Sequence, residues 1–425
     1  MNHTSDPGNA RPAASLVVTG ASEVLTCAAE AADLVGRIPG GAVATAGDRV
    51  LAVGSETRIA AACDLSGAKR IDAGGGIVIP GFVDCHTHLV FPGSRVAEYS
   101  AKAAGAGPEE LKARGIPSGI LATVRMLQNA SQDELVNSAV ARLEHMLRYG
   151  TTTVESKSGY GLSVEGELRM LEVNRRLQAE QPIDIVSTFL GAHEFPENRS
   201  RETYIEEIIK EQIPEVVEAG LAEFNDVYCD DGYYTAEESR RILEAGYEKG
   251  LKIKIHTDAY SHIGGSTLAA ELKAVSADHL NYTTEHEYDL LREAGVVGVV
   301  MPGLDFAVGH TKPFNARAMM NAGITLALAT DLCPGCWIES MPLVIQLACR
   351  LYQFTPAEAL RAATHGAALA LQRGDEIGSL EPGKRADIAI FDLPQFEDLA
   401  YRLGRSEART VIAAGRIVYT AATAA

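Results

Sequence analysis

Eight short apolar runs, each followed by a longer helical pattern, constrain the fold of this chain more than any other feature. The runs end in polar residues near positions 84–88, 155–157, 190–193, 228–230, 255–258, 278–279, 301–303 and 330–331. Alternating strands and helices favour a parallel sheet, and eight such units are the number that closes a (β/α)8 barrel. We therefore predict an α/β fold built around a TIM-like barrel.

The sequence pattern at both ends of the chain is typical of β-strands rather than of alternating strands and helices. Apolar runs at 16–18 and 49–54 are matched at the far end by runs at 386–392 and 410–419. We predict that the two ends together form one small β-sandwich domain. The predicted division is a flexible tail, the N-terminal part of the sandwich, a metal-dependent barrel and the C-terminal part of the sandwich, at residues 1–15, 16–78, 79–372 and 373–425.

Charge and apolar patterning exclude several classes of function. The net charge of −18 argues against a nucleic-acid partner. No apolar run reaches the length of a membrane span, and the first residues lack the layout of a secretion signal. Seven cysteines, an odd number, fit the reduced thiols of a cytoplasm. We therefore expect a cytoplasmic protein that binds neither nucleic acid nor membrane.

The predicted strand ends are rich in metal-ligand types. His86 and His88 stand two residues apart, so that on a strand both imidazoles face the same side. In a barrel the chemistry lies at the carboxyl ends of the strands. A lone histidine at a strand end is usually structural, but five at the ends of four strands, with an aspartate, indicate a metal site. The candidates are His86, His88, His193, His256, His279 and Asp331.

Nitrogen and oxygen ligands of this kind suit particular ions. Three or four of them with an open position suit a catalytic Zn²⁺, and imidazole with carboxylate also suits Fe²⁺. Such an ion would lower the pKa of a bound water towards neutrality. Asp331 could then accept the water's proton, and His279 could donate a hydrogen bond to the developing oxyanion.

Several segments carry a family resemblance. Residues 80–88 read Pro-Gly-Phe-Val-Asp-Cys-His-Thr-His, Asp331 ends the eighth strand, and residues 378–387 read Gly-Ser-Leu-Glu-Pro-Gly-Lys-Arg-Ala-Asp. With these features the chain resembles the amidohydrolase superfamily over nearly its whole length. Within that superfamily it resembles the imidazolonepropionase family, through the segments 88–95, 154–162, 188–193 and 276–280.

The resemblance implies an activity and a set of roles. The family is metal-dependent and opens 4-imidazolone-5-propanoate, a small anionic heterocycle, to N-formimino-L-glutamate in histidine degradation. It also implies a homodimer. One Zn or Fe would be held by His86, His88, His256 and Asp331, with His279 assisting the water, and Arg95, Tyr160 and His193 would bind the substrate. Lys157 could bridge two ions as a carbamate, but it lies on the second strand and the fourth ends without lysine, which favours one ion.

The chain departs from the family pattern at two positions. Ala259 stands where the family usually has Glu or Gln, and Cys333 lies in a stretch where the family has Asn, Pro, Gly and a small hydroxyl residue. Both changes remove hydrogen-bonding capacity, and a lost polar pairing costs on the order of a thousandfold in rate. Either Tyr260 or His262 substitutes, or the substrate is a neighbouring lactam such as imidazolone-acetate or a hydantoin-type acid.

Other readings of the sequence remain open. A deaminase of the same superfamily would use the same metal ligands. A binding protein that has lost its catalytic activity would explain Ala259, although the metal ligands remain in the sequence. Cys333 and Cys336 also have the spacing of a redox pair. We expect these two cysteines to be thiols that line the mouth of a pocket.

Overall fold

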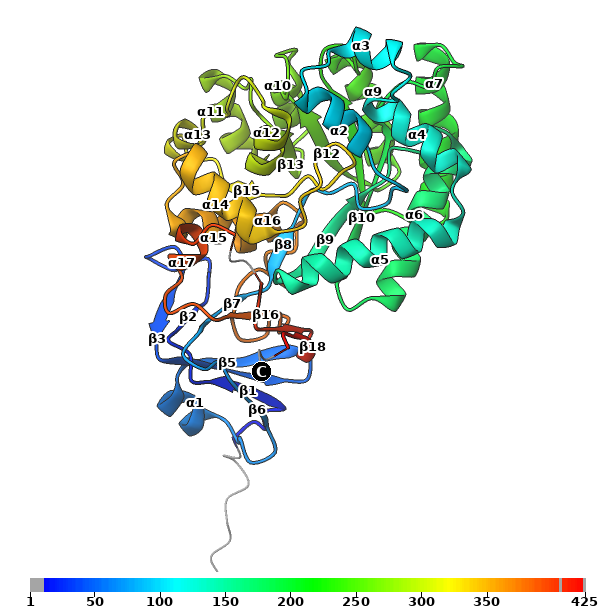
Figure 1. The fold of residues 1–425 in the computed structure, drawn as a ribbon. Coiled ribbons are helices and arrows are strands. Elements are labelled where there is room, and N and C mark those ends of the chain that lie inside the picture. Colours follow the sequence, from blue (N-terminus) through cyan, green and yellow to red (C-terminus); the bar gives the residue numbers. More distant parts are fainter. Residues whose placement is uncertain (1–10, 405–406, 423–425) are drawn as a thin grey trace, which may run out of the picture.

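Eight parallel strands form the barrel that occupies the upper part of Figure 1. In this computed structural model, which describes residues 11–404 and 407–422, the strands are hydrogen-bonded in chain order. They are β8 (Phe82–Asp84), β9 (Thr151–Lys157), β10 (Asp184–Ala192), β11 (Phe224–Cys229), β12 (Lys252–Thr257), β13 (Ser276–His279), β14 (Val297–Val300) and β15 (Leu326–Leu328). The predicted barrel is confirmed.

The barrel closes between its first and last strands just beyond their carboxyl ends. A parallel bridge joins Thr87 to Leu332, and the His88 N–H donates to the Leu332 carbonyl at 2.8 Å. The Asp331 N–H donates to the His86 carbonyl at 3.1 Å. The two segments that carry metal-ligand candidates are therefore fixed to one another by backbone hydrogen bonds.

The remaining strands form two sheets below the barrel in Figure 1, drawn from both ends of the chain. The four-stranded sheet has the order β5 (Arg49–Ser55), β4 (Gly41–Ala46), β1 (Leu16–Thr19) and β6 (Lys69–Asp72). The six-stranded sheet has the order β18 (Arg416–Thr420), β17 (Thr410–Ala413), β16 (Ile388–Phe391), β7 (Ile77–Pro80), β2 (Glu23–Leu25) and β3 (Arg37–Pro39). The predicted sheet region from both termini is confirmed, while the exact domain boundaries stay a prediction.

An apolar layer holds these two sheets together. Val18 and Val43 of the four-stranded sheet belong to the same buried cluster as Val78, Ile388 and Ile412 of the six-stranded one. The six-stranded sheet joins the two ends of the chain, because β7 runs antiparallel to β16. Since β7 leads through Pro80-Gly81 directly into β8, this sheet fixes the start of the barrel strand that precedes His86.

Helices cover the outside of the barrel, and their first residues follow local capping rules. Ser131 and Glu134 form a capping box that starts α5, as Thr235 and Glu238 do for α9. One helix, α1 (Glu56–Ala62), instead packs against β4 and β5 of the four-stranded sheet (Figure 1). Up to β12 the other α-helices are α2 (Val96–Ala103), α3 (Pro108–Ala113), α4 (Gly119–Asn129), α5 (Gln132–Arg148), α6 (Val164–Glu180), α7 (Arg201–Glu207), α8 (Ile213–Glu218) and α9 (Ala236–Glu248). The later ones are α10 (Gly265–Glu271), α11 (Glu285–Ala294), α12 (Pro302–Val308), α13 (Ala316–Asn321), α14 (Met341–Leu351), α15 (Pro356–Arg361), α16 (Ala367–Leu369) and α17 (Asp398–Tyr401).

The predicted N-terminal tail differs from the structure at its inner end. Ala14 is buried, and its N–H donates to the Asp64 carbonyl at 2.9 Å, so the chain already packs on the four-stranded sheet before Leu16. Residues 1–10 of that predicted tail lie outside the described residues. Among the helices of the described ranges, none is long and apolar enough to cross a bilayer.

Candidate metal centre

The strand-end side chains predicted from the sequence meet at the carboxyl end of the barrel. His86 Nε2 and His88 Nε2 lie 3.7 and 3.6 Å from Asp331 Oδ1. The rings of His86 and His256 are 4.5 Å apart between centroids. Ligand atoms of His86, His88 and Asp331 lie within 4.8 Å of one another, as do those of His86, His256 and His279. The predicted constellation is thus one continuous cluster.

Four atoms of this cluster lack the hydrogen bonds that buried polar atoms normally make. They are His86 Nε2, His88 Nδ1, His256 Nε2 and Asp331 Oδ1, none of which has a partner within the described structure. Buried polar atoms are hydrogen-bonded in the great majority of cases, so the orphans of His86, His256 and Asp331 in one cluster indicate a site for another ligand. On His88 the unpartnered atom is Nδ1, while Nε2 is the nitrogen that lies near Asp331. Tetrahedral ligands of one Zn²⁺ lie about 3.4 Å apart, close to the spacing around Asp331. These residues fit a divalent ion.

Protonation in the cluster also suits a cation. Burial lowers the pKa of His86, His88 and His256 well below the usual histidine range, which leaves the neutral imidazole that binds metals. Burial raises the pKa of the Asp331 carboxyl well above its usual range. A neighbouring positive charge reverses such a shift, because it favours the carboxylate. Burial lowers the pKa of His279 to about 4, so His279 is neutral near pH 7.

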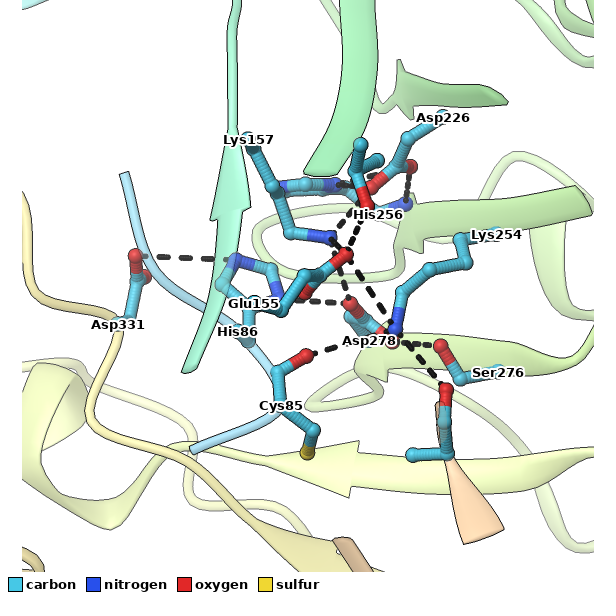
Figure 2. Close-up of polar contacts among 12 residues, drawn as sticks. Cys85, His86, Glu155, Lys157, Asp226, Lys254, His256, Ser276, Asp278 and Asp331 are labelled. Atoms are coloured by element: carbon cyan, nitrogen blue, oxygen red, sulfur yellow. Dashed lines mark hydrogen bonds and ion pairs between the residues drawn. The ribbon is translucent and has the colours of Figure 1, made fainter. Parts of the chain in front are cut away.

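Two buried carboxylates hold the far sides of two of these histidines. Asp278 lies 2.6 Å from His86 Nδ1, and Asp226 lies 3.1 Å from His256 Nδ1 (Figure 2). A carboxylate that accepts from Nδ1 leaves Nε2 unprotonated and directed at the ion. Sequence reasoning missed both aspartates. Their positions in the sequence were informative, because both lie at or next to predicted strand ends. Asp226 precedes Tyr228 by two residues, and Asp278 directly precedes His279.

The backbone is strained at the residues with proposed chemical roles. His279 and Asp331 have φ values of 86° and 50°, which is the left-handed region that non-glycine residues rarely adopt. Strain of this kind persists only where the surrounding structure imposes it, and it gathers at functional sites. Here it turns the chain sharply at the ends of β13 and beyond β15, where the side chains of His279 and Asp331 join the cluster.

A cavity of about 500 Å³ opens over the histidine cluster. Its lining includes all three residues predicted to bind substrate, Arg95, Tyr160 and His193. Sequence reasoning missed other lining residues, among them the aromatic side chains of Tyr228, Tyr233 and His310. Another cavity, of about 550 Å³, lies around Tyr149 and Arg409 and contains none of the predicted site residues.

Arg95 stands at the cationic rim of this cavity. Its Nε and Nη2 atoms donate to the two carboxylate oxygens of Glu98 at 2.6 and 3.0 Å. The same carboxylate lies 2.7 Å from Lys102 Nζ. Two cations therefore share one anion, which leaves a net positive charge at the cavity mouth of a strongly acidic chain.

Tyr160 is placed by a tight loop between β9 and α6. Glu167 accepts from the backbone N–H groups of Gly159, Gly161 and Leu162 at 2.8 to 2.9 Å. His193 Nδ1 lies 3.1 Å from the Gly159 carbonyl, and the His193 ring stacks on that of His88 at 4.8 Å. Both predicted substrate residues are thus fixed by the same loop.

The structure also shows the surroundings of Ala259, one of the two positions that depart from the family pattern. Ala259 offers only a buried methyl group, and its carbonyl lies 2.8 Å from His310 Nε2. Of the two suggested substitutes, Tyr260 lines the cavity, whereas His262 pairs with Glu287 at 2.8 Å and is not part of the lining.

The expectation for the two thiols was wrong in one part. Cys333 lines the cavity, as expected. Cys336 is buried, with its sulfur 3.9 Å from the Thr330 carbonyl, and does not belong to the lining. The two residues exchange backbone hydrogen bonds at 3.0 and 3.1 Å across a tight turn. All seven cysteines are free.

A barrel with this cluster at its carboxyl end defines a metal-dependent hydrolase class, and comparison with known proteins agrees. The model of the amidohydrolase family matches residues 77–418, so the chain belongs to the amidohydrolase family. Its relatives include the imidazolonepropionase of Geobacillus kaustophilus, 43% identical over 96% of this chain and 97% of the relative. The imidazolonepropionase of Haloarcula marismortui is 41% identical over 95% of this chain and 96% of that protein.

Solved structures show the same fold at much lower identity. An adenosine deaminase from Xanthomonas campestris with bound zinc has a TM-score of 0.74 at 20% identity, covering 97% of this chain and 94% of its own. An atrazine chlorohydrolase from Arthrobacter aurescens complexed with zinc has a TM-score of 0.71 at 16% identity, covering 95% of each chain. At these identities the likeness supports the fold alone.

Proposed function

We propose that this protein is a metal-dependent cyclic-amide hydrolase that opens 4-imidazolone-5-propanoate to N-formimino-L-glutamate. The observation that carries the proposal is the group of unpartnered ligand atoms of His86, His256 and Asp331, directly beneath a cavity with a cationic rim. The long similarity to imidazolonepropionases supports the substrate. The proposed ligands are His86, His88, His256 and Asp331, for one Zn or Fe per chain.

The chain's own residues divide the chemistry among them. A bound divalent ion supplies a Lewis acid that lowers the pKa of water. Asp331 then accepts the proton of the attacking water and returns it to the ring nitrogen that leaves. His279, neutral because burial lowers its pKa to about 4, donates a hydrogen bond to the carbonyl oxygen as it becomes negative.

Residues that line the cavity orient the substrate. Arg95 provides the charge for the propanoate carboxylate, as a charge-assisted hydrogen bond. Tyr160 and His193, fixed by the same loop, contact the heterocycle from the side of His88. Tyr228 and Tyr233, whose rings stack at 4.0 Å, form the aromatic wall against which a planar ring packs.

Steady-state assays on a small panel test this function. Imidazolone-propanoate is compared with imidazolone-acetate and a hydantoin-type acid, and released ammonia is measured in parallel. We expect the highest kcat/KM for imidazolone-propanoate, with no release of ammonia. A higher kcat/KM for imidazolone-acetate or for the hydantoin-type acid would identify that compound as the preferred substrate. Release of ammonia would indicate a deaminase. Binding of these compounds without turnover would indicate a binding protein that has lost its catalytic activity.

Two further expectations accompany this function. The homodimer implied by the family resemblance remains a prediction, which light scattering coupled to gel filtration measures directly. The cytoplasmic location also remains a prediction. The proposed chemistry is argued from residues of one chain and rests on neither expectation.

A further inference from the structure

Beneath the metal centre lies a buried charge network that the proposed chemistry does not use. Lys157 ends β9, and its side chain has no solvent exposure. Its Nζ lies 2.9 Å from Glu155, 2.7 Å from Asp226 and 3.5 Å from Asp278. A fully buried lysine is costly unless it is paired, and these carboxylates raise its pKa above the usual range despite the burial. Lys157 is therefore an ammonium ion.

The partners of Lys157 are the carboxylates that hold the ligand histidines. Asp226 Oδ2 accepts from Lys157, while Asp226 Oδ1 accepts from the Val227 and His256 N–H groups at 2.8 and 3.2 Å. Asp278 Oδ1 accepts from Ser276 at 2.7 Å, while Asp278 Oδ2 faces His86 Nδ1 and Lys157. Both groups act only as acceptors in these contacts, which is the behaviour of carboxylates.

The register of the barrel explains why a single cation serves both. Lys157, Asp226 and Asp278 come from β9, β11 and β13, and alternate strands of a barrel contribute the side chains of one interior layer. Asp226 and Asp278 together with His256 would otherwise resemble an anionic ligand set of their own. The Lys157 ammonium group already occupies the space between those two carboxylates (Figure 2).

We propose that Lys157 is a positioning residue of the metal centre. Its ammonium group fixes both carboxylates, and each carboxylate fixes the Nδ1 side of one ligand histidine. Without it, two like charges in the barrel interior would repel one another and turn away from His86 and His256. The inference rests on the ligand set proposed above and goes beyond it, because Lys157 itself touches neither ligand histidine through a hydrogen bond.

A matched pair of variants tests this role without substrate. Lys157→Met removes the charge and keeps most of the volume. Arg385→Met is the control, because Arg385 pairs with Asp184 at 2.7 Å and with Asp387 at 2.6 Å, at the opposite end of the barrel strands from the metal centre. Metal affinity is measured by chelator competition on each metal-loaded protein, and urea unfolding of the metal-free proteins measures stability.

We expect Lys157→Met to weaken metal affinity 10- to 100-fold, the usual effect of losing support behind a metal ligand. Arg385→Met should also lower stability but change metal affinity less than threefold. In the Co²⁺-substituted protein, the visible absorption bands should shift in the Lys157 variant only. Equal metal affinity in the two variants, or unchanged affinity in Lys157→Met, overturns the proposal.

Two more variants keep the test decisive. Lys157→Gln retains a donor and should give an intermediate affinity, and Lys157→Met combined with Asp278→Asn should lose less than the product of the single losses. Should the Lys157 variants not fold, Asp278→Asn alone must accelerate metal loss, and an unchanged rate refutes the proposal. A wild-type chain that binds no divalent ion overturns the ligand set as well. Tight metal binding without lactam hydrolysis refutes only the proposed activity.

Discussion

The guanidinium group of Arg95, which we propose to bind the substrate carboxylate, is held on one side by Glu98. The paired contacts at 2.6 and 3.0 Å fix its plane, so that the remaining edge is presented to the cavity at little entropic cost. Lys102 binds the same carboxylate, but its side chain is 57% exposed. The two cations therefore differ in how far solvent screens their charge.

Arg95→Met should raise the KM for imidazolone-propanoate by about 10- to 100-fold, since a hydrogen bond to a charged group contributes about 1.5–3 kcal/mol. Its kcat should change far less. Lys102→Met is the matched control and should alter KM by less than threefold. Initial rates over a range of substrate concentrations measure both constants, and an equal rise of KM in the two variants would argue against the carboxylate contact.

At the scale of single residues, the sequence predicts the proposed metal ligands better than the residues that contact those ligands from behind. His86 and His88 are recognisable because their spacing places both on one side of a strand. The places of Asp226, Asp278 and Lys157 on the predicted strands are visible in the sequence, but their contacts are not. Those contacts depend on which strands lie next to each other.

The loop that carries Tyr160 is set by close packing at the start of α6. A Cβ added to Gly166 would lie 2.6 Å from the Gly161 backbone, and one added to Gly161 would lie 2.2 Å from the Gly166 backbone. Neither clash can be relieved by rotating a side chain, because both partners are main chain. The two glycines therefore let the loop and the helix approach each other.

Gly166→Ala should destabilise the protein by about 1–3 kcal/mol, the usual cost of overpacking. It should also raise KM, because the shifted loop moves Tyr160. Gly67→Ala is the control, since nothing lies within 4 Å of a Cβ added there. Urea unfolding and initial rates measure the two effects; a stable Gly166 variant with wild-type KM would show that the loop is free to adjust.

Stability at the start of α15 should depend on pH through Glu358. Its hydrogen bonds to Arg317 lower the pKa of Glu358 from 4.5 to about 2, and contacts with Thr355 act in the same direction. A depressed carboxyl pKa adds stability above the unfolded value, and that stability is lost as the pH falls through about 2.

Glu358→Gln should therefore lower the free energy of unfolding by about 1 kcal/mol near pH 7, a value reduced for solvent screening. The difference from wild type should shrink as the pH falls below about 4. Thermal unfolding at several pH values measures it. A difference that stays constant down to about pH 3 would mean that the contribution of Glu358 is not electrostatic.

Element starts were also partly predictable. Helices begin at Gln132 and Ala236, where Ser131 and Thr235 each accept from a backbone N–H in the first turn, and the Ser-x-x-Glu and Thr-x-x-Glu spacing of these caps is visible in the sequence. The turn at 333–336 could not be derived in the same way. The spacing of Cys333 and Cys336 suits several uses, and only the structure shows that Cys333 lines the cavity while Cys336 is buried.

The whole molecule is joined where the C-terminal segment meets the lower end of the barrel. Arg385 donates to Asp184 and Thr153, both at 2.7 Å, and to Asp387 at 2.6 Å. Asp184 begins β10, so this contact lies at the opposite end of the barrel strands from the metal centre. Eight alternating units predicted the barrel, but the pairing of β7 with β16 depends on a contact between distant segments.

Arg385→Met should cost about 3 kcal/mol of stability, because it removes the arginine partner of the buried Asp387 and of the half-buried Asp184. The metal content of the folded protein should stay at the wild-type value. Arg114→Met, which removes an exposed ion pair with Glu110, should cost less than about 0.5 kcal/mol. Urea unfolding with elemental analysis measures both properties, and loss of metal in the Arg385 variant would show that the two ends of the barrel are coupled.

The number of divalent ions per chain tests the convergence of these distant segments most directly. Elemental analysis is applied to the purified wild type, to His86→Ala and to Asp331→Ala, with circular dichroism to verify folding. We expect close to one Zn or Fe per wild-type chain, and less than a tenth of that in either folded variant. A folded Asp331→Ala protein that retains its full metal content would contradict the proposed centre.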